Sequence, residues 1–147
     1  MDPMLTIREI DYHSIEYDME LKLRDAVLRK PLGMSIYNDW LASEKDDLHL
    51  GAFIDNRLVG TLILTSIDNN TVRMRQVAVA QTWQHRHIGT QLVRFAESLA
   101  IQKGYALMLL HARKSAVPFY QKLGYEIIGD EFVEISLPHF GMQKQLQ

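Results

Sequence analysis

Hydrophobic and polar positions along the first third of the chain predict a strand followed by a helix. Residues 4–10 alternate as a strand does, and residues 14–29 carry apolar side chains at helical spacing. The helical pattern stops at 30–33, which contains a proline and a glycine. Residues 39–43 favour a weaker helical turn. The apolar positions of the longer helix are Ile15, Met19, Leu23, Ala26 and Val27.

Two further apolar runs, 48–54 and 57–66, are separated only by Asp55 and Asn56. Residues of this kind accept the left-handed conformations that tight turns between antiparallel strands require. The two runs therefore predict a β-hairpin. A turn at 68–70 leads into the next strand.

The next strand shows a break in its alternation. Apolar side chains stand at Val72 and Met74, and after two polar residues they resume at Val77 and Val79. One extra residue, a β-bulge, produces such a change of phase and interrupts the hydrogen-bond ladder. We therefore expect main-chain groups near Val77 that are free to bind something other than a neighbouring strand.

The second half of the chain predicts a long helix and a buried strand. The helix begins near residue 88 and ends at Gly104, a suitable left-handed cap. Residues 105–110 form an unbroken apolar run, typical of a strand parallel to its predecessor, so that 72–110 is one βαβ unit. The apolar positions of the helix are Ile88, Leu92, Val93, Phe95, Ala96, Leu99 and Ala100.

The remaining residues predict one short helix and three short strands. Ser115 is a suitable N-cap for a helix that runs to Leu123 and ends at Gly124. Strands are expected at 125–128 and 132–136, and a last one ends near Met142. No repeat, linker or low-complexity segment interrupts this order.

Residues 84–90, between the irregular strand and the long helix, are a candidate phosphate-binding loop. The first N–H groups of a helix have no intrahelical partner, and the helix dipole is positive at that end. A pyrophosphate can bind there without a carboxylate-binding pocket or a metal. The loop alone does not say which phosphate-bearing ligand binds.

Composition narrows the function classes. A chain of 147 residues with 47% hydrophobic composition is expected to form one domain, 1–147, around one core. Sixteen basic and 18 acidic residues supply no basic field for nucleic acid. No apolar run is long enough to cross a membrane, and the first residues lack a signal-peptide pattern, so a cytoplasmic location is expected.

Metal and thiol chemistry are not expected either. The chain has no cysteine, which excludes disulfides, thiolate ligands and a cysteine nucleophile. The six histidines form no helical i, i+4 pair, and only His85 and His87 lie close together in the sequence. We therefore expect no metal site.

The order of elements resembles the GNAT superfamily of N-acetyltransferases over nearly the whole chain. The family's loop motif is Arg or Gln, two residues, Gly, one residue, then Gly or Ala, and this chain offers Gln84, His87 and Gly89. A second signature, an aromatic pair followed by Leu-Gly-Tyr, matches residues 116–125. Residues 27–33 and 132–142 resemble a subgroup of small bacterial single-domain members.

The resemblance implies an α/β (α+β) GNAT fold. Its sheet is mixed and mostly antiparallel, with about six or seven strands flanked by about four helices. It has a central bulged strand and a V-shaped parallel opening. A homodimer through the closing strands is expected by analogy.

The resemblance also implies acetyl-CoA as the cofactor. The pantetheine arm is expected along the main chain of Val77, Ala78 and Val79. The pyrophosphate is expected at the loop and helix start, where histidine replaces the usual first glycine at one position. The residues expected there are Gln84, His85, Arg86, His87, Ile88, Gly89 and Thr90.

Acetyl transfer to an amine requires a proton for the departing thiolate and a neutral nucleophile. By resemblance, Tyr120 protonates the thiolate. His139 and Glu134 are candidate bases, each with a plain alternative as a surface or strand residue. His111, at the end of the buried strand, is expected to satisfy a main-chain group.

Three arginines are candidates for the acceptor side. Arg73 and Arg75 share one face of the irregular strand, and Arg29 ends the first helix. Two arginines on one face suggest an anionic acceptor, and a solvated or salt-bridged face is an equally good interpretation.

The sequence thus predicts an acetyl-CoA-dependent N-acetyltransferase acting on a small-molecule or peptide primary amine by direct attack. One alternative is a non-catalytic acyl-CoA binding or sensing module with the same fold. A dinucleotide-binding protein fits less well, because the loop carries one glycine and follows an antiparallel hairpin.

Overall fold

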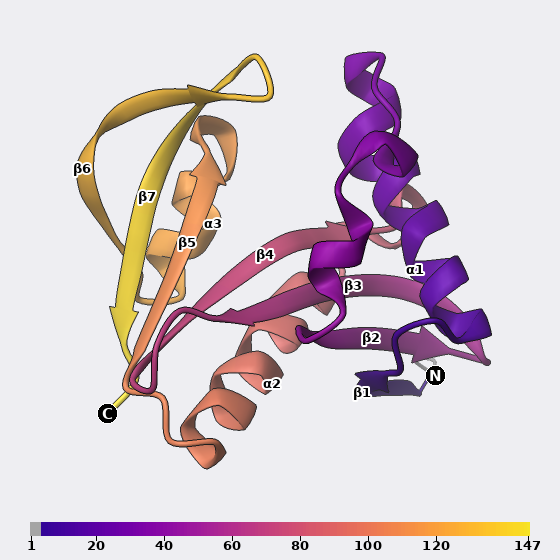
Figure 1. Ribbon diagram of the computed structural model, residues 1–147, viewed down its shortest axis with the longest axis horizontal. Helices are drawn as coiled ribbons and strands as arrows, with labels where there is room; N and C mark the ends of the chain where they lie inside the picture. Colours follow the sequence, from indigo (N-terminus) through magenta and orange to yellow (C-terminus); the bar gives the residue numbers. More distant parts are fainter. Residues whose placement is uncertain (1–3) are drawn as a thin grey trace. The chain divides into compact units, whose positions relative to one another are not determined.

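A computed structural model describes residues 4–147, while residues 1–3, where the expected domain begins, lie outside the described part (Figure 1). The described chain forms a seven-stranded sheet in the order β1-β2-β3-β4-β5-β7-β6. Strands β4 and β5 pair in parallel, and the pairs β1–β2, β2–β3, β5–β7 and β6–β7 are antiparallel, which confirms the expected mixed sheet. The strands are β1 Leu5–Ile10, β2 Leu48–Ile54, β3 Arg57–Ser66, β4 Thr71–Val79, β5 Leu107–Arg113, β6 Glu126–Glu134 and β7 Leu137–Gln145.

Three α-helices and several short helical turns connect these strands. None of the helices among residues 4–147 has the length and apolar character needed to cross a membrane. The helices are α1 Ile15–Arg24, α2 Ile88–Gln102 and α3 Val117–Lys122. The turns are η1 Asp25–Arg29, η2 Lys30–Leu32, η3 Ile36–Asn38, η4 Leu41–Glu44, η5 Gln81–Trp83 and η6 Lys114–Ala116.

The chain divides into two compact units. The first unit comprises residues up to 65 and 76–96, and the second comprises 66–75 and 97–147. The division therefore falls at the end of β3, inside β4 and inside α2.

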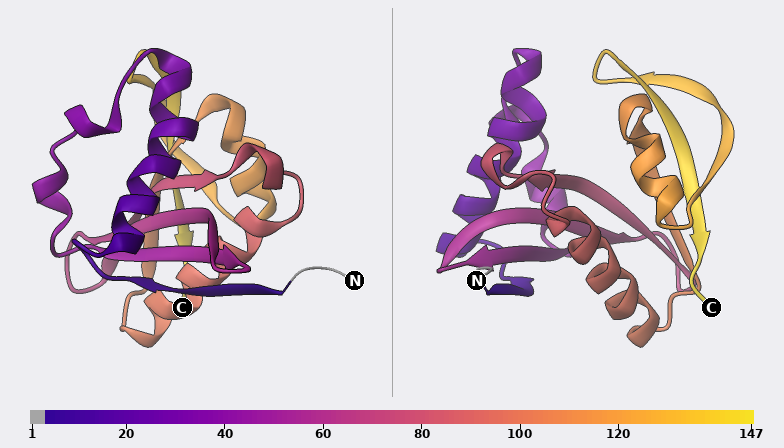
Figure 2. Two further views of the ribbon diagram at one scale, coloured as in Figure 1. Left: turned by 90° about the vertical axis from the view of Figure 1, so that its right-hand side faces the viewer. Right: turned by 180° about the vertical axis from the view of Figure 1, so that it is seen from behind.

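The first unit is built on β1, β2 and β3, with α1 and the first turns of α2 on opposite faces of β2 and β3 (Figures 1 and 2). The hairpin between β2 and β3 lies where the sequence places it. Its two turn residues, Asp55 and Asn56, have φ angles of 51° and 63°, as the tight turn requires.

Helix α1 buries a different face from the expected one. Ser14 caps the helix by accepting the Tyr17 N–H at 3.1 Å, but Ile15 is 80% exposed. The residues that α1 buries are Tyr17, Glu20, Leu21 and Arg24, at helical spacing. The expected apolar stripe is therefore wrong, because buried charged side chains occupy the inner face.

Strand β4 is irregular at the expected place. Gln76 has a φ of 56°, in the left-handed region that few non-glycine residues adopt. The buried positions nevertheless stay at even spacing, at Val72, Met74 and Ala78. The apolar Val77 and Val79 are only partly buried, so the change of phase in the sequence does not extend to the buried positions, while the expected distortion is present.

Helix α2 approaches β3 closely at a glycine. A Cβ atom on Gly60 would lie 2.8 Å from Cδ1 of Leu92 and 3.2 Å from Cγ2 of Ile88. Both helix residues are buried. The absence of a side chain at this one position lets the start of α2 sit directly on the strand, which fixes the loop before it.

The second unit is a layered arrangement of β5, β7 and β6 with α3 on one face (Figure 2). The parallel pairing of β4 with β5 runs from Thr71 and Leu107 to Met74 and Leu110. On β5, Met108, Leu110 and Ala112 are buried, and the residues between them belong to the other face.

Several boundaries in the second unit differ from the expected ones. The N-cap of α3 is Ala116 without a side-chain hydrogen bond, so the predicted Ser115 cap is wrong: a helical turn at η6 precedes the helix instead. The two strands predicted at 125–136 are one strand, β6, with a register shift between Ile128 and Phe132. The last strand extends to Gln145, beyond the predicted end.

Candidate functional site

The loop before α2 presents main-chain N–H groups to solvent. Residues 84–87 are exposed, and the carbonyl of His87 accepts the first α-helical bond from the Gln91 N–H at 3.1 Å. The N–H groups of Ile88, Gly89 and Thr90 therefore precede the first closed turn and have no intrahelical partner. A helix start with unpaired N–H groups is the kind of backbone that binds anions in other proteins.

The histidine that replaces the usual glycine adopts the conformation that the glycine would favour. His87 has a φ of 63°, and His85 also has a φ of 63°. Left-handed residues that alternate with right-handed ones turn successive N–H groups toward one side, and such concavities bind anions. The departure from the family motif thus preserves the loop's backbone.

Two side-chain contacts hold this loop. The Gln84 side-chain amide donates to the Val79 carbonyl at 3.0 Å, which ties the loop to the end of β4. The Arg86 guanidinium lies 5.0 Å from the centre of the Trp83 ring. A cation over an indole face is attracted electrostatically, so Arg86 is held next to the helix start and adds positive charge there.

Tyr120, the candidate acid, lies on α3 in the second unit. It is 8% exposed and packs edge-on against Tyr125, with ring centres 5.8 Å apart. Burial raises the pKa of the Tyr120 hydroxyl. No residue among 4–147 hydrogen-bonds this hydroxyl, so it remains available to donate to another group.

The surroundings of Tyr120 are fixed by a polar anchor. The Tyr125 hydroxyl donates to Glu97 at 2.8 Å, and Lys144 reaches the same carboxylate at 3.0 Å. Lys144 also donates to the Leu123 carbonyl at the end of α3, at 2.8 Å. Three elements of the second unit, α2, α3 and β7, are thus joined where Tyr120 packs.

The two candidate bases lie together, and they bring His111 with them. On the face of the sheet away from α3, Nδ1 of His111 lies 3.0 Å from Oε1 of Glu134. Nε2 of His139 lies 3.7 Å from the other oxygen of the same carboxylate. The Phe132 ring contacts both imidazoles, with centroids 5.0 Å from His111 and 5.9 Å from His139.

The strand register explains this cluster. His111 pairs with Gly141 and Arg113 pairs with His139 across β5 and β7, while Phe132 pairs with His139 across β6 and β7. Directly paired residues share a face, so the side chains from all three strands meet. The sequence instead predicts a main-chain partner for His111. The signal for its actual position is the alternation of β5, which puts the side chains of His111 and Leu110 on opposite faces of the sheet.

The three arginines are placed differently. Arg29 is buried, and its guanidinium donates to Asp39 at 2.9 Å, so it fixes the segment after α1. Arg73 and Arg75 are partly buried and flank the buried Met74 on β4. The Nε atom of Arg73 is buried and has no partner among residues 4–147.

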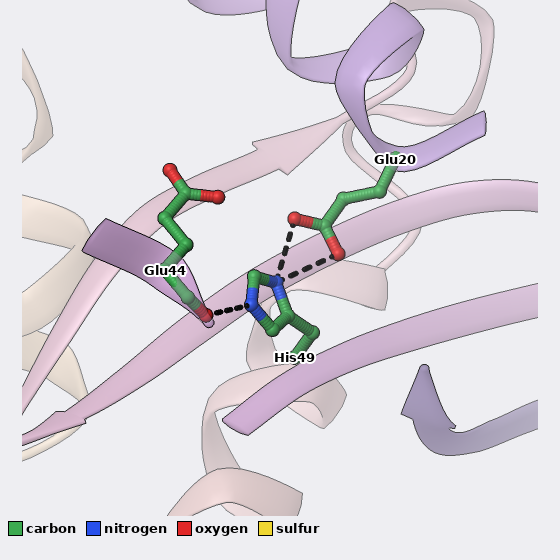
Figure 3. Close-up of side chains that lie close together, drawn as sticks. All are labelled: Glu20, Glu44 and His49. Atoms are coloured by element: carbon green, nitrogen blue, oxygen red, sulfur yellow. Dashed lines mark hydrogen bonds and ion pairs between the residues drawn. The ribbon is translucent and has the colours of Figure 1, made fainter. Parts of the chain in front are cut away.

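A separate charged cluster lies inside the first unit. Figure 3 shows Glu20 from α1, Glu44 from η4 and His49 from β2, whose ligand-type atoms lie within 4.8 Å of one another. Arg24 donates to Glu20 at 2.7 Å and to both oxygens of Glu44 at 2.8 and 2.6 Å. The Tyr17 hydroxyl donates to Glu44 at 2.9 Å.

The hydrogen bonds of His49 show what this cluster is. Nε2 faces the Glu44 main-chain carbonyl at 3.0 Å, and Nδ1 faces the Glu20 carboxylate at 2.9 Å. Because neither partner carries a proton to donate, both nitrogens carry one. The cluster is therefore a neutral set of two carboxylates, one guanidinium and one imidazolium, and no lone pair of His49 is left for a metal.

This protonation state makes stability depend on pH. The contacts with Glu20 and Glu44 raise the pKa of His49 against the opposing effect of burial. A raised pKa contributes stability that is fully present below the unfolded value, about 6.5, and is lost as pH rises through the folded value. We expect urea unfolding of the wild type to show this decline above pH 6.5. The His49→Asn variant is expected to be less stable and to lack the decline, and an unchanged pH profile in the variant would contradict the assignment.

Comparisons with known proteins identify the family of the chain. The model of the acetyltransferase (GNAT) family matches residues 12–125. Protein YyaT of Bacillus subtilis is 31% identical over 98 residues, which cover 67% of this chain and 66% of that protein. Streptothricin acetyltransferase of Escherichia coli is 28% identical over 127 residues, covering 84% of this chain and 71% of that enzyme. The crystal structure of an aminoglycoside 6'-N-acetyltransferase complexed with coenzyme A has a TM-score of 0.82 at 17% identity, over 97% of each chain.

The match to the family model over residues 12–125 places the chain among the acyltransferases. The chain belongs to the GNAT acetyltransferase family, as the sequence resemblance predicts.

Proposed function

We propose that this protein is an acetyl-CoA-dependent N-acetyltransferase that moves an acetyl group to a primary amine by direct attack in a ternary complex. The observation that carries the proposal is the loop before α2, where left-handed His85 and His87 open a helix with unpaired N–H groups. Family membership supports acetyl-CoA as the cofactor. So does the coenzyme A in the aminoglycoside acetyltransferase that shares the fold.

The cofactor's pyrophosphate binds the N–H groups of Ile88, Gly89 and Thr90, with Arg86 adding charge. The pantetheine arm follows the main chain of Val77, Ala78 and Val79, next to the distorted Gln76. A left-handed residue at this position makes the strand irregular next to the proposed pantetheine site.

Tyr120 protonates the departing thiolate. Its raised pKa keeps the phenol protonated at neutral pH, so a donor is present when the carbon–sulfur bond breaks. The acceptor is a small-molecule or peptide amine, and Arg73 and Arg75 favour one that carries a negative charge. Arg29 acts indirectly, by fixing the segment that Asp39 belongs to.

The protein acts as a single domain in the cytoplasm and forms a homodimer through its closing strands. The absence of cysteine agrees with that compartment, where disulfides are rare. The edge strand β6 exposes apolar side chains that a second copy would cover. These are Ile127, Ile128 and Val133, with exposed fractions of 39%, 39% and 75%.

Thermal denaturation tests cofactor binding. Acetyl-CoA present at a hundred times its Kd is expected to stabilise the protein by about 2.7 kcal/mol through mass action, and NAD is expected to have no effect. A melting temperature that acetyl-CoA does not change would refute the proposal. Stabilisation by NAD alone would favour a dinucleotide-binding protein.

An acceptor screen then tests catalysis. Kanamycin, spermidine, tyramine, aspartyl and lysyl tripeptides and an amino acid mixture are offered with acetyl-CoA, and release of the free thiol is measured. At least one primary amine is expected to give thiol release above the rate without amine. Binding of acetyl-CoA without turnover on any amine would favour a binding or sensing module instead.

A further inference from the structure

His111, His139 and Glu134 form a cluster in the second unit. One imidazole nitrogen of this cluster has no hydrogen-bond partner among the described residues. Nδ1 of His111 faces the Glu134 carboxylate at 3.0 Å. Because a carboxylate only accepts, Nδ1 carries the proton, and Nε2 of the neutral ring keeps its lone pair. No residue among 4–147 hydrogen-bonds Nε2 of His111, and its side chain is 36% exposed.

In His139, by contrast, both ring nitrogens face an oxygen atom. Its Nδ1 donates to the Leu137 carbonyl at 2.9 Å, and its Nε2 points to the carboxylate of Glu134. Its side chain is only 4% exposed. His139 therefore supports the cluster from the inside, where an incoming amine does not reach it.

A carboxylate that orients an imidazole through Nδ1 and leaves Nε2 open is an arrangement that suits a general base. We infer that His111 is the general base of the acetyl transfer, with Nε2 as the accepting atom and Glu134 as the residue that positions it. This inference rests on the proposed N-acetyltransferase function. The family match ends at residue 125, so both partners of His111 in the cluster lie beyond it.

The position of His111 on its strand fits this role. Leu110 is the last β5 residue paired in parallel with β4 within this unit, and His111 follows it directly. Its side chain lies on the face opposite Met108, Leu110 and Ala112, away from α3.

The proton balance is complete with these two groups. Nε2 of His111 takes one proton from the substrate ammonium, and the nitrogen lone pair forms the C–N bond while the carbonyl pair moves to oxygen. When the oxyanion collapses, the C–S bond breaks, and sulfur leaves with the bonding pair and takes the Tyr120 proton. The amide nitrogen returns one proton to the tyrosinate, and His111 releases its proton to water.

Three charged or titratable side chains are placed near His111 by the contacts and strand register of the described residues. Glu134 comes from β6, His139 from β7 and Arg113 from β5 itself. Substitutions at these positions separate a catalytic role from a structural one. Glu134→Gln keeps an oxygen that accepts from Nδ1 but removes the charge, whereas Glu134→Ala removes the orienting group.

The test uses the full chain and whichever of kanamycin, spermidine, tyramine or the tripeptides gives turnover with the wild type. His111→Ala is expected to lower kcat/KM about 100-fold near neutral pH, as expected for loss of general base catalysis. The loss is expected to shrink as pH rises, because the amine then becomes neutral without help. The acetyl-CoA-induced rise in melting temperature is expected to equal that of the wild type.

A second measurement determines which ring nitrogen of His111 carries the proton. In ¹⁵N NMR spectra of histidine-labelled protein, the neutral form of His111 is expected to carry its proton on Nδ1. Glu134→Ala is expected to abolish that preference. The same variant is expected to lower kcat more than it changes KM. His13→Asn is the matched control, an exposed histidine of the first unit with a φ of 64°, and its kcat/KM is expected to be unchanged.

The outcomes separate the two levels of the proposal. If the wild type neither binds acetyl-CoA nor turns over, the N-acetyltransferase function fails and the base assignment fails with it. If the wild type turns over and His111→Ala matches it at every pH, only the base assignment fails. A neutral His111 with its proton on Nε2 would overturn it as well, since that nitrogen would have no lone pair to accept.

Discussion

Tyr120→Phe is expected to lower kcat by about 100-fold or more while leaving the affinity for acetyl-CoA within a factor of about two. The substitution removes one hydroxyl and keeps the ring that packs against Tyr125 and Phe119. The hydroxyl has no hydrogen-bond partner among residues 4–147, so its loss breaks no internal contact. Steady-state kinetics with the amine from the acceptor screen, together with calorimetric titration of acetyl-CoA, measures both quantities.

Tyr125→Phe is the matched control for this substitution. It also removes one phenolic hydroxyl from the same aromatic pair, but that hydroxyl donates to Glu97 at 2.8 Å. We expect Tyr125→Phe to reduce the free energy of unfolding by about 1–3 kcal/mol and to leave kcat close to the wild-type value. Equal kcat values for wild type and Tyr120→Phe would remove Tyr120 from the mechanism.

Arg24→Met is expected to destabilise the protein by about 3–5 kcal/mol, because it leaves two buried carboxylates with a single imidazolium. The Arg24 side chain has no exposed surface, and it donates three hydrogen bonds to Glu20 and Glu44. Methionine fills a similar volume, so the loss measures mainly the unpaired charge. Urea unfolding at neutral pH gives the difference in free energy of unfolding.

The exposed pair of Arg8 and Glu16 provides the comparison. These two side chains are 45% and 32% exposed, and their ion pair bridges β1 and α1 in the same unit. Glu16→Gln is expected to cost about 0–1 kcal/mol, as exposed ion pairs do. If Arg24→Met were as mild as Glu16→Gln, the buried cluster would contribute little, and the interpretation of His49 as a paired imidazolium would lose its support.

Local patterns predicted much of the fold. The hairpin at Asp55 and Asn56 follows from turn chemistry, and α2 follows from seven apolar positions at regular spacing that end before Gly104. Both features depend on neighbours in the sequence. The position of the exposed loop before α2 could be predicted for the same reason, since it lies at a helix start that local spacing defines.

The features that could not be predicted from the sequence depend on partners that are far apart along the chain. Helix α1 exposes Ile15 and buries Glu20 and Arg24, because Glu44 and His49 supply the charges that make burial favourable. A hydrophobic pattern cannot anticipate such pairing. His111 was assigned to a main-chain partner for a similar reason: its carboxylate lies 23 positions away, on a strand whose register with β5 is set through β7.

The buried ion cluster also constrains the order of folding. Helix α1 contributes Glu20 and Arg24, and the segment from η4 to β2 contributes their partners, Glu44 and His49. Docking the helix before that segment would strip water from charges that have no counterpart yet, which is unfavourable. Residues 15–49 are therefore expected to be gained and lost together as one cooperative unit, with amide hydrogens of α1 and β2 exchanging at a common rate.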